Sequence, residues 1–167
     1  MHVAVENDAL PGAKVGGLAD VIRDVAPALA RGGCQVTTLV PSHGYLHHLP
    51  GAVEVGRIQF AFRGGMHTAG LFEIPAGPQH KRMRSCVLHH PWMEAFDPGL
   101  GRHRIYVNDG SDQPFFTDSN RFACFSAAAA AAAAQGHLGR LDVLHLHDWH
   151  TALIALLRRS DPACSPL

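Results

Sequence analysis

Two short segments combine residue types and spacings that could bind a ligand. In the first, Lys14-Val15-Gly16-Gly17, the glycines Gly16 and Gly17 let the backbone approach a bound group closely, and the lysine supplies a cation. A helical pattern starts near Leu18, so free N–H groups and a positive dipole end face the same place. This favours phosphate, although the segment is neither GxxxxGK[ST] nor GxGxxG, and a tight turn with a surface lysine is the alternative. Asp20 either faces the cleft or lies on the helix surface.

The second segment, His145 to His150, reads H-L-H-D-W-H. His145 and His147 are two residues apart on an expected strand and therefore share a face. The order departs from the HxHxDH pattern of metal hydrolases because the aspartate stands one place early, so we expect no metal. Carboxylate and imidazole groups exchange hydrogen bonds with hydroxyl groups, which favours sugar binding. We expect Trp149 to lie in the core rather than under a sugar.

The elements that must position these segments form an α/β domain. A strand at 3–5, a glycine turn, a helix at 18–31 and a strand at 35–40 make a βαβ unit, which implies a parallel sheet. Ligands of open α/β sheets bind beyond the carboxyl ends of the strands, where both segments lie. The remaining periodicity predicts strands at 52–63, 68–74, 83–89 and 141–147, a hairpin turn at Gly64-Gly65, and helices at 120–135 and 149–159.

Two further stretches are unusual. Residues 91–117 are rich in Pro, Gly and Asp and predict a long loop. The helix after it, which Asp118-Ser119 could cap, contains the alanine run 127–134. Alanine is the best helix former, so we favour the interpretation that the run reflects drift in composition within a helix. The alternative is a small-residue packing interface.

Composition excludes several classes of protein. The 167 residues (17.9 kDa) have 47% hydrophobic residues, enough for the core of one folded domain. The 14 basic residues balance the 14 acidic ones, which argues against a nucleic-acid partner. No apolar run approaches the ~20 residues of a membrane span, and the N-terminus shows no export signal, so we expect a cytoplasmic protein without a membrane partner. The four cysteines form no CxxC pair, which argues against a disulfide framework.

Three motifs together resemble the start of the bacterial glycogen synthase and plant starch synthase family. Residues 14–21 read K-V-G-G-L-A-D-V, and residues 145–152 read H-L-H-D-W-H-T-A. Residues 118–125 are similar to the family's Asp-x-x-Arg-Phe-x-x-Phe helix. The order and approximate spacing of the motifs also agree with the family, and the likeness extends from Met1 to about Leu157.

This resemblance implies a Rossmann-like parallel-sheet domain, the N-terminal half of a GT-B glycosyltransferase. Such enzymes transfer glucose from ADP-glucose to the non-reducing end of an α-1,4-glucan with retention of configuration, and no metal or cofactor is implied. Lysine and glycines of the first motif meet the sugar nucleotide, and the HDWH aspartate lies near the transferred glucose. The residues thereby assigned to substrate binding are Lys14, Gly16, Gly17, Asp20, Tyr106 and His150, and Asp148 is assigned to catalysis.

The family's next motif, a Thr-Val-His-Asn strand, does not follow, nor does the C-terminal domain that clamps the leaving diphosphate. We therefore expect residues 1–167 to be a truncated N-terminal catalytic domain, with the missing C-terminal domain as its partner and without activity alone. The alternative is a non-catalytic α/β module that binds glucan or nucleotide, or the remnant of a truncated gene. The sequence does not distinguish ADP-glucose from UDP-glucose.

Overall fold

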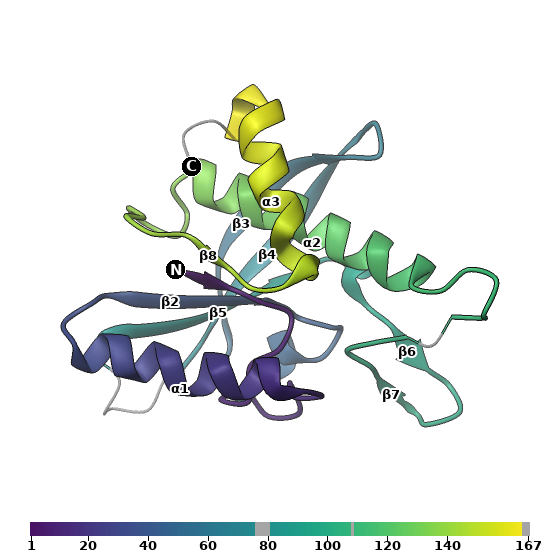
Figure 1. Cartoon of the computed structure of the whole chain (residues 1–167), viewed down its shortest axis with the longest axis horizontal. Coiled ribbons are helices and arrows are strands. Elements are labelled where there is room, and N and C mark those ends of the chain that lie inside the picture. The colour runs from purple at the N-terminus through teal and green to yellow at the C-terminus, as the bar shows by residue number, and fades with distance from the viewer. Residues whose placement is uncertain (76–80, 108, 165–167) are drawn as a thin grey trace.

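A computed structural model describes residues 1–75, 81–107 and 109–164 and shows a three-layered α/β domain (Figure 1). A six-stranded sheet has the order β3-β4-β5-β2-β1-β8. Its strands are β1 (His2–Val3), β2 (Val36–Pro41), β3 (Val53–Phe62), β4 (Gly65–Ile74), β5 (Met83–His89) and β8 (His145–Leu146).

The central part of the sheet is parallel. β1 pairs in parallel with both β2 and β8, and β2 pairs in parallel with β5. The predicted hairpin, β3 and β4, adds to β5 in antiparallel fashion at one edge. The predicted Rossmann-like class is confirmed, with an antiparallel extension of the kind common in large sheets.

Helices cover both faces of this sheet. α1 (Gly17–Arg31) lies on one face, while α2 (Phe116–Ala134) and α3 (Trp149–Ser160) lie on the other (Figure 1). The larger core joins α2 and α3 to the sheet through side chains such as Val3, Leu39 and Phe125. The smaller core lies under α1. None of the helices in the described ranges is both long and apolar enough to cross a membrane.

The alanine run is a packing surface, which corrects our expectation. Ala128, Ala129, Ala130 and Ala132 are all at most 1% exposed. They belong to the core cluster that joins α2 to the sheet. Small side chains let the helix backbone approach its neighbours closely, so larger residues there would force the layers apart.

Several predicted boundaries are also wrong. α2 begins at Phe116, and its N-cap is Phe115 with a left-handed backbone (φ 65°), not Asp118. The predicted strand at 141–147 is only two residues long. The predicted loop at 91–117, of which residue 108 lies outside the described residues, contains a small antiparallel pair, β6 (Phe96–Asp97) and β7 (Arg102–His103).

The order of the strands creates a switch point beside β1. From β1 the chain crosses through α1 to β2 on one side, and the later strand β8 pairs on its other side. The carboxyl ends of β1 and β8 are therefore neighbours, and a crevice at such a point is where open α/β sheets bind ligands. The first candidate segment follows β1 and the second follows β8.

Candidate functional site

A buried carboxylate holds the glycine loop that follows β1. Glu6 is 2% exposed, and its Oε2 accepts hydrogen bonds from the backbone N–H groups of Val15 (2.6 Å) and Gly16 (2.7 Å). An ionised acceptor makes such bonds stronger than those between neutral groups. The loop is therefore fixed from inside, with the amides of Val15 and Gly16 already used by the protein. Beside Gly17, which begins α1, an added Cβ would meet nothing within 4 Å.

Lys14 lies in an exposed ion cluster. Its Nζ is 2.5 Å from Asp20 Oδ1 and 3.3 Å from Asp8 Oδ2, and Arg23 contacts the same two carboxylates. The hydrogen bond with Asp20 raises the pKa of Lys14 and lowers that of Asp20. Asp20 thus faces the lysine and lies in the exposed ion cluster at the start of α1. A phosphate arriving at Lys14 would compete with two aspartates.

Tyr106 joins the two candidate segments. Its hydroxyl donates to Glu6 Oε1 at 2.6 Å, and its ring centroid lies 5.5 Å from that of His150. Burial, followed by the hydrogen bond to Glu6, raises the pKa of Tyr106 well above its usual range. The tyrosine is therefore a neutral donor at any physiological pH, and it links the carboxyl end of β1 to the start of α3.

The third motif holds the loop that carries Tyr106. Asp118 and Arg121 form a buried ion pair at 2.6 Å, with both side chains at most 4% exposed. Asp118 also accepts from the backbone N–H of Val107 (2.9 Å), and Arg121 donates to the carbonyls of Ile105 (2.8 Å) and Arg104 (3.3 Å). The motif thus binds the backbone on both sides of Tyr106, and this use of Asp118 explains why it does not cap α2.

A buried histidine connects this arginine to β1. His43 Nε2 donates to the carbonyl of Val5 (2.8 Å), which leaves Nδ1 to accept from Arg121 (3.2 Å). Burial, and then the charge of Arg121, lower the pKa of His43 to about 3. His43 is therefore a neutral structural group beneath the site.

Asp148 is exposed and strained. It caps α3 by accepting from the N–H of Trp149 at 2.6 Å, with φ 65° and ψ 178°. That backbone region is almost restricted to glycine and costs on the order of 1–3 kcal/mol for other residues. Strain of this kind concentrates at functional sites, so the conformation marks Asp148 as the reactive candidate of the second segment.

The two residues after Asp148 differ from each other. His150 is 6% exposed, burial lowers its pKa, and its Nδ1 has no hydrogen-bond partner within the described part of the chain. Trp149 is 47% exposed, so the expectation of a core tryptophan is wrong. Its ring contacts Phe122 and Phe115 by their edges and leaves much of its surface to solvent.

A hollow of about 330 Å³ opens beside the glycine loop and is rich in positive charge. It is lined by Gly12, Lys14, Val15, Tyr45, Leu100, Arg102, His103, Arg104, Ile105 and Tyr106. A larger hollow, of about 660 Å³, lies between the ends of α2, β8 and α3 and contains none of the predicted site residues. The smaller hollow is the one whose chemistry suits an anion.

His145 and His147 share a face of β8 as predicted, and a third ring joins them. Strand pairing places His2 directly beside His145. Burial lowers the pKa of His2 and of His147 to about 4, so both rings are neutral at pH 7.

The structure therefore brings the predicted site residues together in two pairs. Lys14 contacts Asp20 at the glycine loop, and Tyr106 contacts His150 at the turn formed by residues 147–150, which we call the Asp148 turn. Sequence reasoning missed Glu6, which is hydrogen-bonded both to the glycine loop and to Tyr106. An acidic residue directly after a buried strand was the available signal. Asp8, Arg23 and His43 were also missed, because their partners are set by packing.

Comparison with known proteins gives consistent matches. A family model described as the starch synthase catalytic domain matches residues 1–166. The glycogen synthase of Thermus thermophilus is 37% identical over 156 residues, which are 93% of this chain and 29% of the relative. Glycogen synthase 1 of Rhizobium meliloti is 33% identical over 165 residues, which are 96% of this chain and 32% of the relative.

A solved structure agrees with these sequences. The catalytic domain of starch synthase IV from Arabidopsis thaliana, bound to ADP and acarbose, matches with a TM-score of 0.74 and 26% identity. The match covers 99% of this chain and 31% of that one. The chain thus spans less than a third of the length of these relatives.

Proposed function

Because the chain belongs to the family of starch synthase catalytic domains, we propose that it forms the N-terminal, acceptor-side part of a retaining glucosyltransferase. The reaction is transfer of glucose from ADP-glucose to the non-reducing end of an α-1,4-glucan, as in glycogen or starch synthesis. The observation that carries this proposal is that Glu6 and Tyr106 join the glycine loop to His150, two residues after Asp148, at the β1–β8 switch point.

Each group has a role in this proposal. Lys14 binds the donor phosphates after exchanging its contacts with Asp8 and Asp20, and the open space beside Gly17 admits the diphosphate. Asp148 lies near the transferred glucose. The buried Nδ1 of His150 has no partner among the residues that the structure describes, and a sugar hydroxyl would satisfy it, as buried polar groups generally require.

We also propose that residues 1–167 alone do not transfer glucose. Departure of a diphosphate needs cations aimed at the developing charge. Lys14, the cation of the glycine loop, is already paired with two carboxylates. The remaining cations would come from a second domain facing this one. A cytoplasmic location is a further part of this proposal.

A chimera tests the proposal. Residues 1–157 are joined to the part of Thermus thermophilus glycogen synthase that follows the matching helix, and ADP release is measured with ADP-glucose and glycogen. We expect turnover on the order of 1 s⁻¹ or more from the chimera and none above background from residues 1–167. A parallel assay with UDP-glucose distinguishes the donor.

Matched variants complete this experiment. Asp148→Asn in the chimera should lower turnover by at least about 100-fold. The control Asp142→Asn changes an exposed aspartate just before β8 and should leave the rate unchanged. A folded chimera that binds maltooligosaccharide but gives no turnover would favour the second candidate, a non-catalytic glucan-binding module. Normal turnover by residues 1–167 alone would refute the requirement for a second domain.

A further inference from the structure

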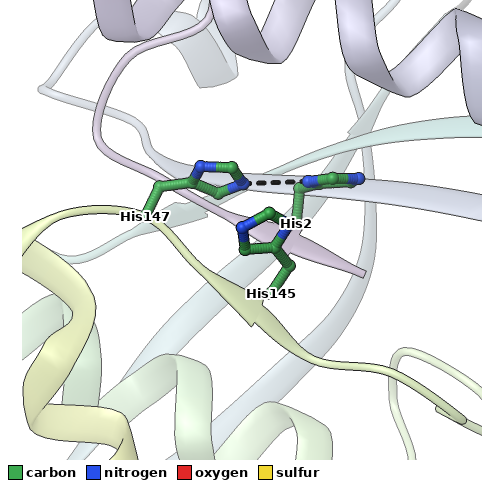
Figure 2. A group of neighbouring side chains, drawn as sticks. All are labelled: His2, His145 and His147. Atoms are coloured by element: carbon green, nitrogen blue, oxygen red, sulfur yellow. Dashed lines mark hydrogen bonds between the residues drawn. The ribbon is translucent and has the colours of Figure 1, made fainter.

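Three histidines meet where the first and last strands of the sheet pair. In the parallel pairing of β1 with β8, His2 lies opposite His145. Side chains alternate along a strand, so His147 returns to the same face two residues later. Figure 2 shows the three rings side by side, with His2 from one strand and the other two from its neighbour.

The spacing of their nitrogens is close to that of a metal site. His2 Nδ1 and His147 Nε2 are 2.9 Å apart, and one nitrogen from each of the three rings lies within 4.8 Å of the others. Zinc binds imidazole nitrogen at ~2.0–2.1 Å in tetrahedral geometry, which places two ligand nitrogens about 3.3 Å apart. The His2–His147 pair therefore needs to open by only a few tenths of an ångström.

The third ring has the freedom to complete the set. His2 and His147 are 4% and 7% exposed and are held by the sheet, whereas His145 is exposed. Its ring now stacks on that of His147, with centroids 4.0 Å apart. Rotation of this exposed side chain would turn a nitrogen toward the other two without moving the backbone.

The donor set defines the class of ion. Three imidazoles without a thiolate or a carboxylate suit zinc, nickel or copper and suit magnesium or calcium poorly. Three protein ligands also leave a fourth position open to water or an anion, as in zinc sites with three histidines. Among the described residues, these three are the sole group of histidine, cysteine and acidic side chains with this spacing.

We propose that His2, His145 and His147 bind a divalent transition-metal ion of the zinc class at the β1–β8 pairing. The ion replaces the hydrogen bond between His2 and His147 and ties the two strands together. This departs from the expectation of no metal, which rested on the order of residues 145–150 and on the family resemblance. Neither took in His2, which is 143 positions away from His145 in sequence. The proposal is independent of the glucosyltransferase proposal.

The site lies directly before the reactive turn. His147 immediately precedes Asp148, so an ion held there fixes the chain that enters the strained conformation. Metal binding should therefore change the environment of Trp149, the next residue. The exposed indole provides a spectroscopic signal for binding that needs no enzymatic activity.

The test uses residues 1–167 without a histidine tag, stripped with a chelator and titrated with Zn²⁺ against a chromophoric competitor. Co²⁺ serves as the coloured probe of tetrahedral geometry. We expect saturation at one ion per chain, visible bands typical of tetrahedral nitrogen ligation, and a change in tryptophan fluorescence. A raised melting temperature should accompany binding, since the ion binds the folded chain.

His145→Gln removes a ligand whose side chain is exposed, so the variant should fold. It should weaken binding by about 100-fold or more, because even outer-shell partners of metal ligands are worth 10–100-fold. His137→Gln removes an exposed histidine outside the cluster and should leave the affinity unchanged. Absence of one-to-one binding, or equal affinity of His145→Gln and the parent chain, would overturn the proposal.

Discussion

The two halves of the candidate site are built in opposite ways. The glycine loop is held by the buried Glu6, which is linked through the half-buried Tyr106 and its loop to the buried Arg121. In the second half, Asp148 is exposed, has a strained backbone and caps α3 through one side-chain hydrogen bond to the N–H of Trp149. The difference teaches that the first half is a preformed frame and that the second half carries the reactive group.

Of all the substitutions in the frame, we expect the largest loss of stability at Arg121. Arg121→Ala leaves Asp118 buried without its partner and frees the loop around Tyr106. Breaking a buried ion pair costs about 3–5 kcal/mol, so we expect a loss of that size in the free energy of unfolding, measured by urea titration. Arg140→Ala, which removes a 90% exposed ion-pair partner, should change it by less than about 0.5 kcal/mol. Equal effects of the two would contradict the buried frame.

The next largest effect is expected at Glu6. Glu6→Gln removes the charge that two loop amides and one tyrosine hydroxyl address. Hydrogen bonds to a charged group contribute about 1.5–3 kcal/mol, so we expect a loss of about 2 kcal/mol and a shift of the Val15 and Gly16 amide resonances.

Tyr106→Phe, combined with Glu6→Gln, completes a double-mutant cycle that measures the coupling between these two residues. If Glu6 and Tyr106 act as one unit, the double variant should lose less stability than the sum of the single variants. Additive losses would show that the tyrosine and the glycine loop are independent and would separate the two halves of the site.

The free energy of unfolding should also depend on pH through His43, which lies beneath the frame. The pKa of His43 falls from 6.5 in the unfolded chain to about 3 in the folded one, so this histidine stabilises the fold above pH 6.5. As the pH falls from 6.5 toward 3, His43 becomes protonated in the unfolded state but stays neutral in the folded state. Stability should fall by up to about 1.4 kcal/mol per pH unit for this one group.

His43→Gln tests this contribution. The variant should show a shallower decline between pH 6 and pH 4, by about 1 kcal/mol per unit, in urea titrations at each pH. Ring resonances of His43 in the parent chain provide a second measurement and should remain those of a neutral imidazole at pH 5. A ring that titrates near pH 6.5 would contradict the buried, neutral assignment.

The smallest effect is expected at the strained turn. Asp148→Gly relieves the backbone but loses the cap and gains freedom in the unfolded chain, so the net change should lie between zero and about 1 kcal/mol of added stability. Asp148→Ala keeps the strain and loses the cap, which should cost about 1 kcal/mol. Thermal unfolding of the pair measures this difference. If glycine destabilises as much as alanine, the turn is not strained.

Features determined by residues close together in sequence were predicted well, and features that depend on distant residues were not. Hydrophobic periodicity predicted β5 and the β3–β4 hairpin closely, because those patterns are local. The cap assigned to Asp118 was wrong because its carboxylate binds Val107 and Arg121 instead. The burial of the alanine run was missed because composition does not reveal which helix lies against the sheet.

The site follows the same rule. The two segments after β1 and β8 were visible as motifs, and their residues carried the family resemblance. Their connections were not visible, because Glu6 and Tyr106 are 100 positions apart. The meeting of His2 with His147, 145 positions apart, likewise depends on which strands become neighbours. Packing and strand order determine these contacts, and neither can be derived from a single sequence.

The position of β1 has a consequence for how the chain is made. His2 pairs with His145, 143 positions later in the sequence, so the β1–β8 pairing cannot form until both segments have been synthesised. At about 5–20 residues per second, that delay is roughly 7–30 seconds. During this time β1 has no partner on its β8 side, and pairings between such distant segments form slowly. Synthesis rate and chaperone supply should therefore affect the yield of the folded domain.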